Sequence, residues 1–486
     1  MYINGKWEKP ENGLYFDSYD PASGEVWSQI ARGNEQDVQK AVEAAYNTFK
    51  NSSWSEKTFT ERGQVLRKLG DLLAEKVDEL AAFETQDNGK VIREMKGQLS
   101  YMPQFFYYYA GLADKISGDT LPIDKKDLFV YTKKEPVGVV AAITPWNSPL
   151  YLTFLKLAPA LAAGNTIVIK PSEYTSASLL EFAKLTEEAG VPDGVINIIT
   201  GFGNEVGDAL TTHPHISKVA FTGGPEAARH IVKNTAENFA KPTLELGGKS
   251  PNIIFDDANL DNALMGVLAG IFGGTGQSCV AGSRVFLHDD IYDEFMEKLV
   301  KRTNSIVVGD PQNDKTEVGP VATKEQLEKI EKYVAKGIEE GANLVVGGKR
   351  PENLEEGWYF EPTIFEHTSH SDCLVQEEIF GPVLSIIRFN NEEEIVRLAN
   401  DTRYGLAAGI WTENIGRAQR MIDSIDSGIV WVNTYRSISP MAPIGGSGIS
   451  GYGREGGIES INEYLKTKTV WINSSSEEMA DPFVMR

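Results

Sequence analysis

Hydrophobic side chains near the start of the chain recur at the spacing of a helix. Val38, Val42 and Ala45 follow Asn34, a residue type that favours helix N-caps. A second apolar stripe with the same period runs through residues 65–80. We therefore expect the first hundred or so residues to be mainly helical.

From residue 137 onward, the pattern changes to short apolar runs that alternate with amphipathic segments. The apolar runs predict strands at 137–143, 166–169, 195–199 and 218–221, and the segments between and after them predict helices at 150–161, 176–189, 206–210 and 226–238. Strands that alternate with helices are typical of a parallel, doubly wound sheet.

The alternation resumes after Gly247 and predicts a second sheet. Its expected strands are 252–255, 285–287, 344–346, 384–389, 406–411 and 429–432. The fold class expected from the two series is α/β, with two doubly wound, Rossmann-like domains. The first would comprise residues 1–120 and 137–246, and the second residues 247–447.

Two segments rich in strand-forming residues fall outside both series. They are residues 121–136 and 464–474, and we expect them to form a small projecting β arm that pairs with another subunit. A homodimer or a homotetramer would follow from such pairing. The polar stretch after residue 473 is expected to be a loose tail.

Charge and composition narrow the class of protein. The 486 residues include 47 Lys and Arg against 69 Asp and Glu, a formal charge of −22, which disfavours nucleic acids and anionic membranes as partners. No apolar run is long enough to span a membrane, and the N-terminus lacks the features of a signal peptide. The two cysteines are too few for a disulfide scaffold, so a cytoplasmic protein is expected.

Unusual residues follow each of the four strands predicted first, at the edge where α/β proteins bind ligands. These segments are 145–147, 170–173, 201–203 and 222–224. Thr222, Gly223 and Gly224 open a predicted helix, whose free amide groups could hold a phosphate. A plain strand-to-helix turn would look the same.

Three side chains are candidates for covalent chemistry. Cys279 lies among glycines and small residues, so it is either a nucleophile or an inert core thiol. Glu245 lies between two leucines and could be a desolvated general base, or a surface residue paired with Lys249. Asn147 could donate to an oxyanion or stabilise a turn. The six histidines show no metal-binding spacing, and no metal is expected.

Together these segments resemble the aldehyde dehydrogenase superfamily over nearly the whole chain. The matching motifs, in the family's order, are Pro145-Trp146-Asn147, Lys170-Pro171-Ser172-Glu173, Phe221-Thr222-Gly223, Leu244-Glu245-Leu246-Gly247-Gly248-Lys249, Gly276-Gln277-Ser278-Cys279, Glu377-Glu378-Ile379-Phe380-Gly381-Pro382 and Ser450-Gly451-Tyr452-Gly453-Arg454-Glu455. The resemblance implies NAD(P)-dependent oxidation of an aldehyde to a carboxylic acid.

The resemblance also implies a role for each catalytic candidate. Cys279 would attack the aldehyde and become a thioester after hydride transfer to the nicotinamide. Asn147 and the amide group of Cys279 would hold the oxyanion. Glu245 would activate the water that hydrolyses the thioester, and Glu455 would assist proton transfer.

The cofactor contacts implied by the resemblance lie mainly in the first domain, which would bind NAD(P), while the second would carry the nucleophile. Lys170, Ser172 and Glu173 would lie at the adenosine ribose, and this glutamate favours NAD without excluding NADP. The other expected contacts are Gly223 and Gly224 at the pyrophosphate, Glu377 at the nicotinamide ribose, Phe380 near the ring, and Ile143, Trp146, Gly203, Phe221, Thr222 and Leu246.

Three positions that resemble the substrate tunnel of the family lack the aromatic or bulky residue common there. They are Ser148, Gly273 and Ile444. We hypothesise a tunnel that is wider, or more polar near Ser148, and that accepts a bulky aldehyde. Tyr101 and Tyr151 could refill the space.

Three other functions stay open at this stage, one of them a thiol hydrolase that would use Cys279 and Glu245 without a nucleotide. A CoA-acylating aldehyde dehydrogenase would pass the thioester to CoA, but such enzymes tend to lack a base at the position of Glu245. A catalytically idle structural or binding protein would be expected to have lost Cys279, Glu245 or Asn147. All three residues are present.

Overall fold

The computed structural model describes residues 1–51, 53–367, 369–479 and 481–484. The N-terminal part is helical from residue 35 onward, as predicted, whereas residues 1–34 contain short strands and loops in place of the expected helix. Its helices are α1 (Glu35–Asn51), α2 (Ser53–Glu56), α3 (Phe59–Glu75), α4 (Val77–Asn88), α5 (Ile92–Tyr101) and α6 (Pro103–Leu112). The side chain of Asn34 accepts the amide hydrogen of Asp37 at 3.2 Å, so the predicted N-cap of α1 is confirmed.

The first large sheet contains the four strands predicted first. Its order is β2 (Lys6–Trp7), β1 (Tyr2–Ile3), β9 (Ile196–Ile198), β8 (Thr166–Lys170), β7 (Val139–Ile143), β10 (Ile216–Thr222), β11 (Lys241–Glu245) and β21 (Gly451–Tyr452). The strands from β9 to β11 are parallel. The outer strands β1, β2 and β21 are two residues long, too short for a periodic signal.

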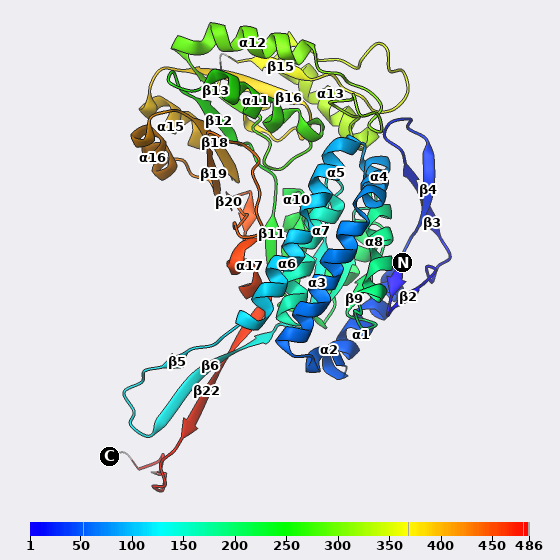
Figure 1. Cartoon of the computed structure of the whole chain (residues 1–486), viewed down its shortest axis with the longest axis vertical. Coiled ribbons are helices and arrows are strands. Elements are labelled where there is room, and N and C mark those ends of the chain that lie inside the picture. The colour runs from blue at the N-terminus through cyan, green and yellow to red at the C-terminus, as the bar shows by residue number, and fades with distance from the viewer. Residues whose placement is uncertain (52, 368, 480, 485–486) are drawn as a thin grey trace.

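Helices cover both faces of this sheet (Figure 1). The connecting helices are α7 (Pro149–Ala163), α8 (Ala177–Glu188), α9 (Asp208–Thr212) and α10 (Pro225–Asn234). Side chains of α3, α6, α7 and α8 share one hydrophobic core with the sheet, and those of α1, α9 and α10 share another. The predicted helix at 206–210 instead begins as a π-turn, Gly203–Gly207, before α9.

The second large sheet confirms the second predicted series. Its order is β14 (Asn343–Val346), β15 (Thr363–Glu366), β16 (Val383–Phe389), β13 (Arg284–His288), β12 (Pro251–Ile254), β18 (Ala407–Trp411) and β19 (Ile429–Val432). Only β15 was not predicted, because its four residues form a short run without clear alternation. The helices of this part are α11 (Leu260–Ile271), α12 (Tyr292–Asn304), α13 (Lys324–Glu339), α14 (Cys373–Gln376), α15 (Glu392–Asn400) and α16 (Ile415–Ser424).

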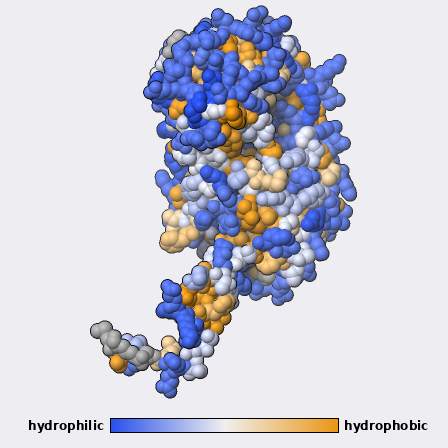
Figure 2. Space-filling view, turned by 60° about the vertical axis from the view of Figure 1, so that its left-hand side comes forward, coloured by the Kyte–Doolittle hydropathy of each residue, from blue (hydrophilic) through white to orange (hydrophobic). Residues whose placement is uncertain are grey.

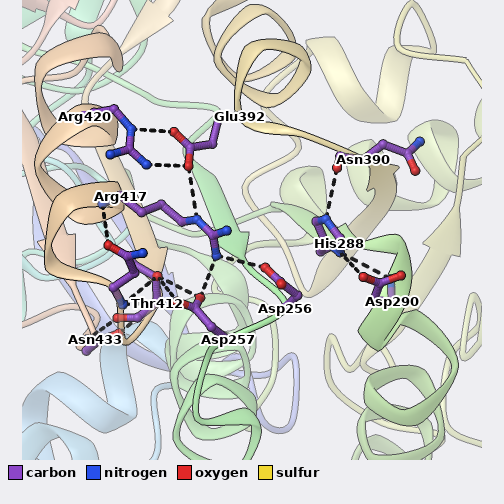
Figure 3. Close-up of polar contacts among 11 residues, drawn as sticks. Asp256, Asp257, His288, Asp290, Asn390, Glu392, Thr412, Arg417, Arg420 and Asn433 are labelled. Carbon is purple, nitrogen blue, oxygen red and sulfur yellow. Dashed lines mark hydrogen bonds and ion pairs between the residues drawn. The ribbon is translucent and has the colours of Figure 1, made fainter.

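A network of charged groups ties the second sheet to two of its helices (Figure 3). Arg417 on α16 donates to Asp256 and Asp257, which follow β12, with each bond at 2.8 Å. It also donates to Glu392 at the start of α15 at 3.2 Å. Arg420, one turn along α16, donates twice to the same glutamate. Arg417 therefore joins three segments, whereas Arg420 joins two.

The predicted β arm projects from the body of the molecule (Figure 1). It is a three-stranded antiparallel sheet in the order β22 (Leu465–Asn473), β6 (Leu128–Pro136) and β5 (Thr120–Leu121). Both predicted segments are strands, and they pair with each other from Leu465↔Pro136 to Asn473↔Leu128. The outer edge of β22 has no neighbouring strand within the described chain.

The smaller elements connect these parts. They are the hairpin of β3 (Tyr15–Tyr19) and β4 (Val26–Ala31), the pair β17 (Tyr404–Gly405) and β20 (Ser447–Gly448), and helix α17 (Gly457–Asn462). None of the helices in the described part of the chain is long and apolar enough to cross a membrane.

Candidate active site

Two cavities meet at Cys279. The first has a volume of about 190 Å³ and the second about 330 Å³. The side chains that line both are Asn147, Leu152, Thr222, Glu245, Leu246 and Cys279. Glu245 ends β11 of the first sheet, and Cys279 lies between β12 and β13 of the second. The junction therefore brings together the predicted nucleophile, base and oxyanion donor from both halves of the molecule.

The backbone conformation of the loop before Cys279 explains why this segment is rich in glycine. Gly274, Thr275 and Gly276 have φ values of 61°, 59° and 70°, in the left-handed region that favours glycine. A Cβ on Gly276 would lie 2.1 Å from the carbonyl oxygen of Gly381. Thr275, strained at this φ, is held by a hydrogen bond from its hydroxyl to the carbonyl of Gly319 at 3.1 Å. The glycines thus serve the geometry of the loop that presents Cys279.

Cys279 and Glu245 both favour their neutral forms in this setting. Burial, and then the carboxylates of Glu378 and Glu245, raise the pKa of Cys279 to about 12. Burial, and then the charge of Glu455, raise the pKa of Glu245 well above its usual value. A thiol of this kind needs a nearby base to become a nucleophile, and Glu245 lines the same cavities.

Asn147 lies between β7 and α7 at the junction and is buried. Its Nδ2 atom donates one hydrogen bond to the carbonyl of Gln277 at 2.9 Å, two residues before Cys279. An amide nitrogen carries two hydrogens, so this bond fixes the side chain and leaves the second hydrogen for a ligand. That is the requirement for an oxyanion donor.

Glu455 belongs to a buried polar network behind Glu245. The Nζ atom of Lys156 lies 2.6 Å from Oε1 of Glu455 and 2.6 Å from the hydroxyl oxygen of Thr222. Glu455 and Thr222 also line the second cavity. The structure therefore places Glu455 where a proton could pass between the cavity and the interior.

The first cavity contains several of the predicted cofactor residues. Trp146, Gly223, Gly224 and Phe380 line it together with Thr222 and Leu246. Gly224 is the N-cap of α10, and a Cβ at this residue would meet nothing within 4 Å, so the approach to the helix is open. The rings of Trp146 and Phe380 lie edge to face with centroids 5.2 Å apart.

Glu377 is not in this cavity, and its assignment is corrected. Its carboxylate accepts a hydrogen bond from the hydroxyl of Tyr333 at 2.7 Å, and about half of its side chain is exposed. Glu378 lines the cavity instead and accepts the amide hydrogen of Gly248 at 3.0 Å. Glu377 has an extended backbone conformation at the end of α14, so its side chain and that of the next residue, Glu378, point in opposite directions.

The remaining predicted contacts do not line the two cavities at Cys279. Lys170 is buried at the end of β8, with its Nζ atom 3.6 Å from the carboxylate of Glu173. Glu173 borders a separate open cavity with Phe202 and Tyr174. The other four are Ile143 at the end of β7, the buried Ser172, the exposed Gly203 and Phe221, whose ring packs beneath Gly223.

The sequence did not reveal two further lysines, one that lines the first cavity and one in the hydrophobic core. Lys329 of α13 lines the first cavity with Gln326. Lys156 lies inside α7 among apolar residues, where a single lysine gave no signal of its partner 299 residues away.

The second cavity contains the predicted tunnel positions, but its shape departs from the expectation. Ser148 and Ile444 line it, and Tyr151 fills part of the space as anticipated. Tyr101 is exposed and does not line it. The space above Gly273 is taken by Arg436, because a Cβ there would lie 2.5 Å from its Nη1 atom.

Comparison with known proteins decides the family. The model of the aldehyde dehydrogenase family matches residues 7–470. The chain belongs to the aldehyde dehydrogenase family. The resemblance seen in the motifs is thereby confirmed, as is the enzyme class that it implied, NAD(P)-dependent oxidation of aldehydes.

Curated relatives and solved structures agree with this assignment. A (Z)-2-((N-methylformamido)methylene)-5-hydroxybutyrolactone dehydrogenase of Acinetobacter baylyi is 51% identical, with 100% of this chain and 99% of the relative covered. A betaine aldehyde dehydrogenase of Bacillus subtilis is 42% identical over 98% of this chain and 97% of the relative. The NAD⁺ complex of an aldehyde dehydrogenase from Bacillus cereus is 43% identical, with a TM-score of 0.96 over 98% of this chain and 96% of the other.

Proposed function

We propose that this aldehyde dehydrogenase oxidises its substrate through a thioester on Cys279 that water hydrolyses with the help of Glu245. The observation that carries the proposal is the junction of the two cavities. Cys279, Glu245 and Asn147 line both, so a group that enters from either side meets all three. The relatives are named for different substrates, a 5-hydroxybutyrolactone and betaine aldehyde, so family membership does not identify the aldehyde.

The residues of the first cavity fit a nicotinamide dinucleotide. The open N-terminus of α10 at Gly224 suits a pyrophosphate, and Lys329 adds positive charge to the same cavity. Glu378 can accept hydrogen bonds from ribose hydroxyls, and Glu173 beside Lys170 suits an adenosine ribose without a 2′-phosphate. We therefore propose NAD as the preferred cofactor, held mainly by residues 1–120 and 137–246. When bound, it would accept hydride from the reacting carbon.

The first chemical step that the chain itself performs is nucleophilic attack. The thiol proton of Cys279 passes to Glu245, and the sulfur forms a bond to the carbonyl carbon. The carbonyl oxygen becomes negative and is held by Nδ2 of Asn147 and by the amide group of Cys279. The bond from Asn147 to the carbonyl of Gln277 keeps the donor in place.

The second step is hydrolysis. Glu245 first releases to the solvent the proton that it took from Cys279. It then takes a proton from water as the water oxygen attacks the thioester carbon, and the Cys279 thiolate leaves and regains this proton from Glu245 as the acid forms. A buried carboxylate with a raised pKa is suited to both proton transfers, since its affinity for protons approaches that of the groups it serves. The presence of Glu245 in the cavity favours hydrolysis over transfer of the acyl group to CoA.

We also propose that the β arm joins two copies of the chain. Phe129, Trp471 and Ile472 are about half exposed on β6 and β22. The space-filling view shows apolar surface along the arm (Figure 2). An unpaired strand edge beside exposed apolar side chains is a natural site for pairing with a second chain.

The proposed chemistry is tested by following the absorbance of the reduced cofactor. The intact protein and its Cys279→Ala variant are mixed with NAD or NADP and a panel of aliphatic, aromatic and hydroxylated aldehydes. We expect reduced cofactor only with intact Cys279 and no requirement for CoA. Product that forms only when CoA is present would contradict the hydrolytic mechanism.

A further inference from the structure

Two cationic side chains line the second cavity, beyond the residues that the reaction uses. Lys90 follows α4, and Arg436 follows β19. Neither makes an ion pair within the described part of the chain. The Nζ atom of Lys90 donates to the hydroxyl of Ser148 at 2.7 Å, and Nη1 of Arg436 donates to the carbonyl of Ala269 at 2.9 Å. Both groups keep further N–H donors for a ligand.

The position of the Arg436 side chain depends on the local backbone conformation. Its φ is 60°, in the left-handed region that is costly for a residue with a side chain. Its guanidinium occupies the space above Gly273, where a Cβ would lie 2.5 Å from Nη1. The absence of a side chain at 273 is therefore what admits the guanidinium to the cavity.

The charges around these cations leave a positive balance. The carboxylate of Glu94 lies near Arg436 and accepts the amide hydrogen of Gly274 at 3.0 Å. Burial raises the pKa of Glu84, the other nearby carboxyl group, to about 8, so it is mostly neutral at pH 7. Burial and the charge of Arg436 lower the pKa of Lys90 to about 8, which leaves it mostly protonated at the same pH. Glu245 and Glu455 also line the cavity, but burial raises the pKa of Glu245 well above its usual value, and Glu455 is paired with Lys156. Among the remaining groups, the two cations face the carboxylate of Glu94.

The rest of the cavity lining contains both polar and apolar residues. Gln98, Ser437 and Ser439 lie on the lining with the two cations. Most of the other lining residues are apolar, among them Tyr151, Leu155, Leu406, Ile429, Trp431 and Ile444. A carbon chain can lie along this apolar surface while an anionic group meets the cations.

We propose that the substrate is an aldehyde that carries a second, anionic group, most simply a carboxylate, bound by Arg436 and Lys90. This inference rests on the proposed function, since Cys279 must react with the aldehyde end. The chain as a whole has a formal charge of −22, which would repel an anion at long range. The cations of the cavity offset this repulsion locally and disfavour aldehydes with a positive charge.

The test compares matched aldehydes with the purified wild-type protein and NAD. One arm is a series of linear aldehydes of increasing length that end in a carboxylate, including succinate semialdehyde. The second arm is the methyl ester of each, and the third is an aldehyde that carries a trimethylammonium group. We expect kcat/KM for the best carboxylate to exceed that of its ester by about tenfold or more, as loss of a charge-assisted hydrogen bond would give. The trimethylammonium aldehyde should be poorer than the ester.

Variants separate binding of the anion from a general structural role. Arg436→Gln should raise KM for the carboxylate about tenfold or more and change KM for the ester little. Gly273→Ala should act in the same direction by displacing the guanidinium. Arg67→Gln, on an exposed position of α3 outside both cavities, is the matched control and should keep the wild-type ratio.

Three results would overturn the proposal. The first is equal kcat/KM for acid and ester with the wild-type protein, which needs no variant and holds even if Arg436→Gln does not fold. The second is an equal loss on both substrates in Arg436→Gln. The third is that none of the aldehydes is oxidised although the protein binds NAD. This result would overturn the proposed function as well, and it is recognised because the esters and the trimethylammonium aldehyde also give no reduced cofactor.

Discussion

Lys156 and Glu455 form a buried ion pair, with 2.6 Å between Nζ and Oε1, beside the proposed general base. The lysine side chain is fully buried and that of the glutamate almost so. The negative charge of Glu455 raises the pKa of Glu245, and the positive charge of Lys156 lowers it. Burial is the largest cause of the raised pKa of Glu245, and the charges of the pair adjust it further.

Replacement of Glu455 by Gln should move the pH dependence of turnover to lower pH. The base acts when ionised, so the rate rises as pH increases through the pKa of Glu245. Removal of the negative charge lowers that pKa, because Lys156 remains and favours the ionised carboxylate. The measurement is kcat/KM against pH. The acid limb should shift down in Glu455→Gln and stay in place in Glu459→Gln, a control on the exposed side of α17. A shift to higher pH would show that the charge of Glu455 acts in another way.

Replacement of Glu245 by Gln should separate oxidation from hydrolysis. The variant lacks the base for both proton transfers, so the burst of about one equivalent of reduced cofactor per site should itself be slower, and turnover after the burst should fall about 10²–10⁴-fold. The burst is read by rapid mixing, and the acylated Cys279 by the mass of the protein. Normal steady-state turnover in the variant would exclude Glu245 as the hydrolytic base.

Arg417 should stabilise the second sheet more than Arg420, although both are arginines on the same helix. The side chain of Arg417 is 21% exposed and bonds three carboxylates, whereas that of Arg420 is 57% exposed and bonds one (Figure 3). We expect Arg417→Met to lower the free energy of unfolding by about 1–3 kcal/mol and Arg420→Met by less than about 1 kcal/mol. Denaturant unfolding of both variants checks the order. Equal losses would mean that burial of the network is unimportant.

Charged residues on the arm should dissociate the proposed oligomer. Trp471→Asp places a carboxylate on the exposed face of β22, where it would be desolvated if a second chain packs there. Sedimentation should show a smaller particle for this variant than for the wild-type protein. Phe239→Asp, at a side chain that is 92% exposed on the body of the molecule, is the control. If the mass is the same in all three proteins, the arm does not hold the copies together.

Much of the fold could be predicted because its signal is local. The buried strands of both sheets are short apolar runs between amphipathic helices, so each can be predicted from a few consecutive residues. The strands that were missed are two to six residues long, and short ones such as β15 gain their register only from a neighbour. The segments 121–136 and 464–474 were recognised as strands by composition, but their mutual pairing joins residues more than 300 positions apart.

The residues of the candidate site also differ in whether local sequence was enough to predict them. Cys279, Glu245 and Asn147 stand in short motifs whose residue types already imply their chemistry. The choice of Glu378 over Glu377 depended on which of two adjacent carboxylates faces the cavity, and only the tertiary structure decided it.

The sequence by itself determined the family, the alternation of strands and helices, and the candidates for the reacting groups, because these depend on local sequence patterns. The tertiary structure decided the electrostatic setting, because charges act through space and not along the chain. Arg436 enters the cavity where Gly273 leaves room, and Lys156 meets Glu455 across 299 positions. No periodicity connects such pairs, and only folding brings them within contact distance.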